Sequence, residues 1–216
     1  MKQLKIDIVS DVSCPWCIIG YKGLEQALEN VQQDILAIIE WHPFELNPQM
    51  PSEGQELVEH LTEKYNISEA QCEQNKLVVE QRGLDAGYEF GLRGGGRIFN
   101  TFDAHRLLHW AKEYNKQTEL KLALFDLYFQ QGGNPSEHEQ LLQVIELVGL
   151  PFDEAKDILN SQKFATEVRS EQQSSAQKGI SSVPAMIINN KYLINGGQIA
   201  VASVNLLTQI ANDEIA

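Results

Sequence analysis

Residues 11–20 read Asp-Val-Ser-Cys-Pro-Trp-Cys-Ile-Ile-Gly, where a short apolar run gives way to a helical pattern. Proline is favoured at the first position of a helix, because its missing N–H would have no partner there. Pro15 therefore predicts a helix with Cys14 as its N-cap and Cys17 one turn further along. The positive end of the helix dipole favours a thiolate at Cys14. This spacing predicts an exposed attacking thiol at Cys14 and a sheltered resolving thiol at Cys17.

The residues on either side predict a β-α-β unit. Residues 5–9 are apolar except for Asp7, which is typical of a short strand. Apolar residues recur at helical spacing over residues 15–31, and residues 35–41 form a second strand-like run that ends near Pro43. We expect a parallel, buried pair of strands. A Cys-x-x-Cys pair next to such a unit is typical of a thioredoxin-like redox site.

The rest of the chain divides into a helical block and a final β-β-α pattern. Residues 53–180 have mostly helical periodicity, with capping boxes predicted at Ser68 and Ser136 and a loop at residues 94–96. Two apolar runs, residues 184–188 and 191–194, are separated by two asparagines, which suit a hairpin turn. A last amphipathic helix is predicted over residues 201–210.

The cysteine pair has two other interpretations. A structural zinc site usually needs four ligands, but the only other cysteine is Cys72, and no second Cys-x-x-Cys or close Cys/His pair accompanies it. Two buried cysteines that pack as small hydrophobic side chains would also fit. The position of Pro15 at a strand-to-helix junction favours redox chemistry over both. We therefore predict no metal and no bound cofactor, and we expect Cys72 to pack within a helix.

Composition restricts the class of partner. The chain has 216 residues, three cysteines and a formal net charge of −13. Such an acid excess argues against nucleic acid or an anionic membrane surface as a partner, because both would need a basic face. No apolar run approaches the ~20 residues of a membrane span, and Asp7 interrupts the apolar stretch that a secretory leader would need. These features predict a cytoplasmic protein.

The segment at residues 11–20 resembles the active-site segment of DsbA-family thioredoxin-fold oxidoreductases, in particular the FrnE-like branch. Three further blocks resemble the same branch and occur in the same order. They are residues 41–48, residues 100–108, and residues 183–185 followed by 196–198.

This resemblance implies an α/β fold: a thioredoxin fold, β-α-β followed by β-β-α, interrupted by a large all-helical insertion. It implies a thioredoxin-like domain formed by residues 1–50 and 165–216, with residues 51–164 as the helical insertion domain. It also implies that Pro184 is a cis-proline facing the cysteine pair, which would leave the Val183 backbone free to pair with an extended substrate. By residue type alone, Pro184 would equally well open a strand.

The expected function is that of a thiol–disulfide oxidoreductase, acting as a disulfide reductase or isomerase. Cys14 would attack a substrate disulfide and Cys17 would resolve the mixed disulfide. The expected substrate-binding residues are Pro15, Trp16, Val183 and Pro184. Cys17 must lose a proton to act, and Asp11 and Asp7 are the candidate bases. Asp11 fits equally well as a turn-forming residue at the strand end.

The expected partners are protein or small-molecule disulfides and dithiols, with glutathione as a further candidate. A second interpretation is a glutathione-dependent isomerase or transferase, because 2-hydroxychromene-2-carboxylate isomerases and kappa-class transferases share this split fold. Those enzymes are expected to have serine where Cys14 stands and to lack the second cysteine, which disfavours this interpretation. A third is a non-catalytic chaperone that binds its partner in the cleft between the two parts.

Overall fold

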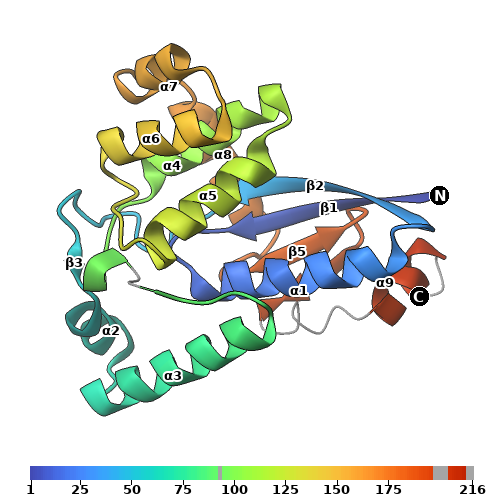
Figure 1. The fold of residues 1–216 in the computed structure, drawn as a ribbon, viewed down its shortest axis with the longest axis horizontal. Helices are drawn as coiled ribbons and strands as arrows, with labels where there is room; N and C mark the ends of the chain where they lie inside the picture. The colour runs from blue at the N-terminus through green and yellow to red at the C-terminus, as the bar shows by residue number, and fades with distance from the viewer. Residues whose placement is uncertain (92–93, 197–203, 213–216) are drawn as a thin grey trace.

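The central sheet of the computed structural model joins the two ends of the chain (Figure 1). The structure describes residues 1–91, 94–196 and 204–212. Strand β1 (Lys2–Ser10) pairs in parallel with β2 (Ile35–Pro43) and antiparallel with β5 (Ala185–Ile188). Strand β5 also pairs antiparallel with β6 (Tyr192–Asn195), which gives the order β2-β1-β5-β6. The predicted α/β class, parallel pair and C-terminal hairpin are confirmed.

Helices make up most of the remaining described chain. They are α1 (Pro15–Val31), α2 (Leu57–Tyr65), α3 (Glu69–Asp85), α4 (Phe102–Ala111), α5 (Gln117–Phe129), α6 (His138–Val148), α7 (Phe152–Leu159), α8 (Ala165–Gln177) and α9 (Val204–Ala211). Two 3-10 turns, η1 (Gly94–Gly96) and η2 (Lys112–Tyr114), and a two-stranded pair, β3 (Gln55–Glu56) and β4 (Arg97–Ile98), lie between them. Within the described ranges, no helix combines the length and apolar character needed to cross a membrane.

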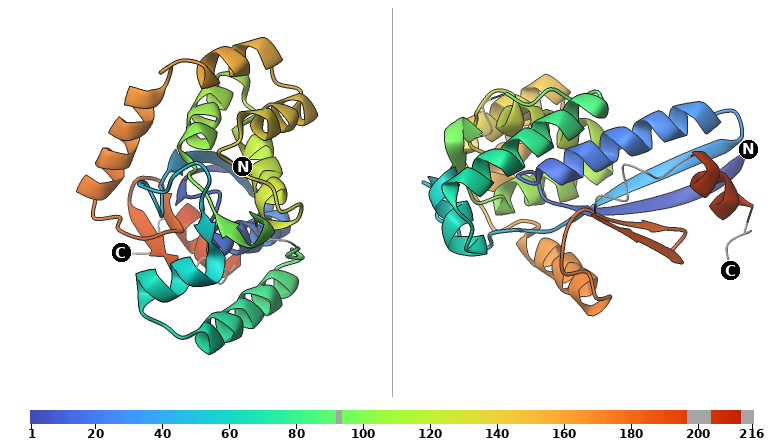
Figure 2. Two further views of the ribbon diagram at one scale, coloured as in Figure 1. Left: turned by 90° about the vertical axis from the view of Figure 1, so that its left-hand side faces the viewer. Right: turned by 90° about the horizontal axis from the view of Figure 1, so that it is seen from below.

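The two faces of the sheet are covered by different helices (Figure 2). Helices α1 and α9 pack on one face, where Leu4, Ile6 and Ile8 of β1 join the main hydrophobic core. Helix α8 contacts β2 from the opposite face. Successive side chains of a strand point to opposite faces, so Asp7 lies on the side that α8 covers. Strand β1 is therefore buried on both faces over residues 6–10. The prediction that both strands are buried is wrong for β2, because Leu36 and Ile38 remain exposed on the face that α8 covers only in part.

A second hydrophobic core lies within the helical block. Buried side chains of α4, α5, α6 and α7 form it, among them Leu107, Trp110, Leu120, Ile145 and Ile158. Val12, two residues before the first cysteine of the motif, is part of this cluster. The segment that leads into α1 is therefore anchored to the helical block as well as to the sheet.

Local details of the helical block differ from the sequence predictions. The capping box at Ser68 is confirmed, because its hydroxyl accepts from the Gln71 amide while the Gln71 side chain accepts from the Ser68 amide. The box predicted at Ser136 is wrong, because Glu137 is the N-cap of α6. The Ser136 hydroxyl instead lies 2.6 Å from the side-chain oxygen of Asn134 and donates 2.9 Å to a backbone carbonyl of Ser52.

Two predictions fall partly outside the described residues. The last helix begins at Val204 in the structure, and residues 201–203 of the predicted helix lie outside the described ranges. The same holds for residues 197 and 198 of the block that resembles the FrnE-like branch. The β3–β4 pair was not predicted, since two residues per strand are too few to give an alternating pattern.

Candidate active site

The cysteine pair occupies the first turn of α1, as predicted. Cys14 is the N-cap, with an extended backbone (φ −92°, ψ 111°), and Pro15 opens the helix. The Cys17 amide donates to the Cys14 carbonyl at 3.1 Å, and the Cys14 amide donates to the Asp11 carbonyl at 3.3 Å. Backbone hydrogen bonds therefore fix both cysteines relative to the end of β1.

Both thiols are buried and free, which corrects one prediction. Cys17 is 1% exposed, as expected, but Cys14 is only 3% exposed rather than open to solvent. The reason is long-range packing, since Val183 packs against the core cluster that contains Cys14. Trp16 is the exposed residue of the motif, at 37%.

The loop before β5 faces Cys14. The Val183–Pro184 peptide bond is cis, and the Cys14 sulfur donates to the Val183 carbonyl across 3.8 Å. The Pro184 carbonyl accepts from the Gly196 amide at 2.8 Å. Strand β5 begins only at Ala185, so Pro184 precedes the strand. The structure thus brings together Cys14, Val183 and Pro184 from the two ends of the chain.

Burial dominates the proton chemistry of Cys17. Burial and the neighbouring Cys14 thiol raise the pKa of Cys17 well above its ordinary value. A thiolate at this position is therefore costly unless a nearby group accepts the proton or balances the charge. This makes the identity of that group the main mechanistic question of the site.

Asp11 accepts hydrogen bonds from two backbone amides. Its carboxylate accepts from the amides of Ser13 (3.3 Å) and Leu46 (2.7 Å), and one oxygen lies 3.6 Å from Nε2 of His105. Burial raises the pKa of Asp11, but the neighbouring His105 imidazole and the hydrogen bond from the Leu46 amide outweigh it and lower the pKa overall. These contacts favour a permanently ionised carboxylate that shapes the loop, in line with the turn-forming interpretation.

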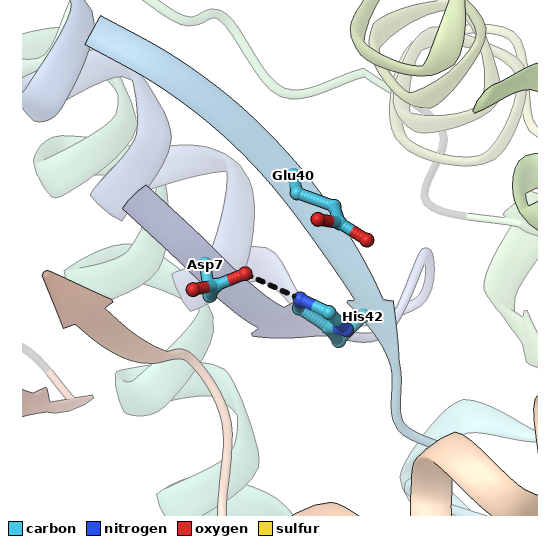
Figure 3. Close-up of side chains that lie close together, drawn as sticks. All are labelled: Asp7, Glu40 and His42. Atoms are coloured by element: carbon cyan, nitrogen blue, oxygen red, sulfur yellow. Dashed lines mark hydrogen bonds and ion pairs between the residues drawn. The ribbon is translucent and has the colours of Figure 1, made fainter. Parts of the chain in front are cut away.

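Asp7, the other candidate base, lies on the opposite face of the sheet from α1. Its carboxylate is bound by Nε2 of His42 at 2.7 Å (Figure 3). The Lys5 ammonium lies 3.0 Å from the same carboxylate. Asp7 is also buried. The structure does not bring Asp7 to the cysteine pair.

Lys121 of α5 is a buried charged residue that the sequence did not predict. Its side chain is almost completely buried, and Nζ lies 5.4 Å from the ring centre of Trp41 and 4.9 Å from that of Phe125. Burial lowers the pKa of Lys121 to about 8, although the negative charges of Cys17 and Asp11 act to raise it. The available sequence signal is that Lys121 is the one charged residue in the apolar run of residues 120–125.

One group of side chains has the donor types of a metal site. The ligand atoms of Asp7, Glu40 and His42 lie within 4.8 Å of one another. Figure 3 shows these three side chains. The Lys5 ammonium lies 3.0 Å from Asp7 and 3.6 Å from Glu40, and Lys112 lies 3.1 Å from Glu40. Because two ammonium groups already neutralise these carboxylates, the group is an ion-pair network within the fold.

Comparison with known proteins agrees with this arrangement. A family model described as a DSBA-like thioredoxin domain matches residues 5–205. The crystal structure of a probable DsbA oxidoreductase, SCO1869 from Streptomyces coelicolor, is 29% identical, with a TM-score of 0.87 over 99% of this chain and 92% of that one.

Two more distant structures share the fold. A 2-hydroxychromene-2-carboxylate isomerase is 12% identical, with a TM-score of 0.70 over 98% of this chain and all of its own. The cytosolic disulfide reductase DsbM from Pseudomonas aeruginosa, solved with GSH, is 16% identical, with a TM-score of 0.67 over 95% of this chain and 98% of its own. Since the family model spans nearly the whole sequence, the chain belongs to the DSBA-like thioredoxin domain family.

Proposed function

We propose that this chain is a thiol–disulfide oxidoreductase that acts as a disulfide reductase or isomerase through Cys14 and Cys17. The observation that carries the proposal is the placement of two free thiols in the first turn of α1, with the Cys14 sulfur against the Val183 carbonyl. An extended substrate that pairs with this backbone would bring its own sulfur to Cys14.

The reaction has two steps. The Cys14 thiolate attacks one sulfur of a substrate disulfide, so that a mixed disulfide forms and the other substrate sulfur leaves as a thiolate. The Cys17 thiolate then attacks the Cys14 sulfur, which forms the Cys14–Cys17 bridge and releases the second substrate thiolate. Two electrons pass to the substrate. In isomerisation, a different thiolate of the same substrate attacks the substrate sulfur of the mixed disulfide, so that a new substrate disulfide forms, Cys14 leaves as a thiolate and no net electron transfer occurs.

The burial of Cys14 favours small or extended substrates. A thiol that is 3% exposed is accessible to a small disulfide or a single extended peptide more readily than to a folded surface. Pro15 and Trp16 on one side and Val183 and Pro184 on the other would bind such a substrate. We further propose glutathione as the external thiol that returns the bridge to the dithiol. The DsbM neighbour, a cytosolic disulfide reductase solved with GSH, supports this assignment and a cytoplasmic location.

The division into two domains is part of the proposal. Residues 1–50 and 165–216 would form the thioredoxin-like domain, and residues 51–164 the helical insertion. Val12 supports a role for the insertion beside the site, because this residue leads into the cysteine motif and packs in the hydrophobic core of the insertion.

The test is reduction of insulin by a dithiol reductant at a fixed protein concentration. The wild-type chain is expected to accelerate the reaction, and Cys14→Ser is expected to abolish the acceleration. Cys72→Ser is the matched control, because Cys72 is also a buried free cysteine but lies in α3, and it should retain activity. A wild-type chain that neither reduces insulin nor any small disulfide would contradict the proposal.

The glutathione-dependent isomerase stays a second candidate on fold similarity alone. It predicts that isomerisation of a 2-hydroxychromene-2-carboxylate survives Cys17→Ala, since a single residue at position 14 would suffice to bind the glutathione thiol. The oxidoreductase proposal predicts that neither the wild-type chain nor Cys17→Ala isomerises a 2-hydroxychromene-2-carboxylate.

A further inference from the structure

Strand β2 forms one edge of the central sheet, and the N-terminal half of this edge lacks backbone partners. We propose that residues 35–39 bind an extended peptide segment as an added antiparallel strand, with apolar side chains at its centre and basic side chains on either side. Leu28 of α1, which lies beside this edge, is about 20 Å along the helix from Cys14. The surface is therefore separate from the cysteine pair, and the inference does not depend on the proposed function.

Hydrogen bonds at Trp41 show which backbone groups of β2 point away from β1. The Trp41 N–H and C=O both bond the side chain of Gln117 in α5 at 2.8 Å, so they face outward. Backbone groups alternate in direction along a strand, so those of Ala37 and Ile39 face outward as well. Among the described residues, none bonds these outward groups of Ala37 or Ile39. In Figure 1, β2 lies along the upper border of the sheet, with α5 beside its C-terminal part.

The sequence of this edge lacks the usual protection against strand pairing. Natural sheets block an exposed edge with lysine, proline, a bulge or a covering segment. Residues 35–39 read Ile-Leu-Ala-Ile-Ile, with no charge and no proline. Leu36 and Ile38 are 52% and 44% exposed on the face that α8 covers in part. An apolar edge of high β propensity is therefore open to an added strand.

A groove of about 260 Å³ follows the same edge on the side of α1. Ile35 and Ala37 of β2 line it together with Tyr21 and Leu28 of α1. Side chains directly opposite each other on paired strands point to the same face, so the residue of an added strand opposite Ala37 would enter this groove. An apolar side chain there would contact Tyr21 and Leu28. The next residue on either side would point to the other face, beside the two exposed apolar side chains of β2.

The charge of the groove selects its occupant. Glu25, Glu29 and Gln32 complete the lining. Lys22 pairs with Glu25 at 2.7 Å, but no cation among the described residues forms an ion pair with the exposed Glu29. Basic side chains two positions before and after the central residue of an added strand would point to the same side, toward these carboxylates. An apolar segment with flanking lysine or arginine therefore fits both the groove and its rim.

A second copy of this chain fits the edge less well. Each copy carries a formal net charge of −13. A two-fold antiparallel pairing centred on Ala37 would place Asp34 opposite Glu40, and like charges directly opposite each other are destabilising. The same pairing would bring two acidic grooves together. The charges therefore favour a basic peptide over self-association.

The experiment uses a synthetic peptide as the probe. Its sequence is Ser-Lys-Val-Leu-Val-Lys-Ser, with a fluorescein label at the N-terminus and an amidated C-terminus. Fluorescence anisotropy at low ionic strength measures its binding to the wild-type chain, which should bind it. A peptide with glutamate in place of both lysines should bind roughly tenfold more weakly, because it would face the acidic groove.

N-methylation of the peptide tests whether it binds as a strand. Methylation of the central leucine should weaken binding about tenfold, because this N–H would donate to the Ala37 carbonyl. Methylation of either valine should have little effect, since those N–H groups would point away from β2.

Two variants test the surface from the protein side. Ala37→Pro removes the outward N–H at the centre of the edge, a position where an edge strand tolerates proline, and it should weaken binding about tenfold. Glu29→Lys reverses an exposed charge of the groove and should weaken binding roughly fivefold. The matched control is Glu146→Lys, at an exposed position of α6, which changes the net charge equally and should leave binding unchanged. Circular dichroism checks that each variant is folded; if Ala37→Pro is not, Glu29→Lys decides.

Three results would overturn the inference. The first is no binding of the lysine peptide to the wild-type chain. The second is equal binding of the leucine-methylated and valine-methylated peptides, or equal weakening by Glu29→Lys and Glu146→Lys, which would indicate non-specific adsorption. The third is a dimer of the wild-type chain that Ala37→Pro abolishes, which would assign the edge to a second copy. Peptide binding without insulin reduction would contradict the proposed function alone.

Discussion

The sulfur of Cys14 lies 3.8 Å from the carbonyl oxygen of Val183, a residue 169 positions further along the chain. This contact joins the start of α1 to the loop before β5, and the antiparallel pairing of β1 with β5 holds the two in place. The cysteine motif is therefore one half of a site whose other half comes from the far end of the sequence.

Cys17→Ala is expected to trap the first intermediate. Without a resolving thiol, the mixed disulfide between Cys14 and a substrate persists, so intact-mass measurement should find one substrate molecule per chain. Cys14→Ser serves as the control and should carry none. Equal labelling of the two variants would show that Cys14 is not the attacking residue.

Gln117→Leu should destabilise the fold by about 2–3 kcal/mol. The Gln117 side chain accepts from the Trp41 amide and donates to the Trp41 carbonyl, both at 2.8 Å, and so closes the edge of β2. Loss of the amide leaves two buried backbone groups without partners. Urea unfolding measures the effect, with the exposed Gln74→Leu as the control. A change within experimental error would show that water replaces these bonds at no cost.

Glu171 should make stability depend on acidic pH. Burial raises the pKa of Glu171, but the hydrogen bonds from His109, His42 and Lys112 outweigh it and hold the pKa well below 4.5. A lowered pKa in the folded state means that the stabilisation is present above the unfolded value of 4.5 and is lost as the pH falls below it. The midpoint of thermal unfolding should fall between pH 6 and pH 3 in the wild type. It should fall less steeply with pH in Glu171→Gln. If the unfolding midpoint of the wild type and of Glu171→Gln fell with pH at the same rate, Glu171 would not be the source of the pH dependence.

Trp16→Ala should weaken binding of aromatic or peptide disulfides more than binding of small aliphatic ones. Trp16 is the exposed apolar surface next to Cys14, so its loss removes contact area for the substrate. KM should rise several-fold for an aromatic disulfide while kcat changes little. The same change in KM for a small aliphatic disulfide would indicate a distorted site instead.

Local features of the fold follow directly from the sequence. Pro15 places the start of α1, and the two asparagines at residues 189 and 190 adopt the positive φ (52° and 55°) that the hairpin requires. The wrong prediction of a capping box at Ser136 also has a local cause. The Ser136 hydroxyl, which the capping box would use, instead bonds the side-chain oxygen of Asn134, two residues earlier. Where two local partners compete, residue types alone do not decide between them.

Features set by distant segments are harder to predict. Cys14 is buried because Val183 packs near it, and no spacing within the motif reports such a contact. Lys121 lies in an apolar helical run, but its burial against Trp41 depends on how α5 packs against β2. The position of Pro184 opposite the cysteine pair was expected only from the family resemblance. By residue type alone, Pro184 would fit the start of a strand equally well.

The most direct test of the central claim is equilibration of the wild-type chain with excess oxidised glutathione, followed by peptide mass mapping. The account predicts a Cys14–Cys17 bridge, with Cys72 still open to alkylation after unfolding, and return of both thiols when reduced glutathione is added. A chain that keeps Cys14 and Cys17 as free thiols, or that forms a bridge only through Cys72, would contradict it.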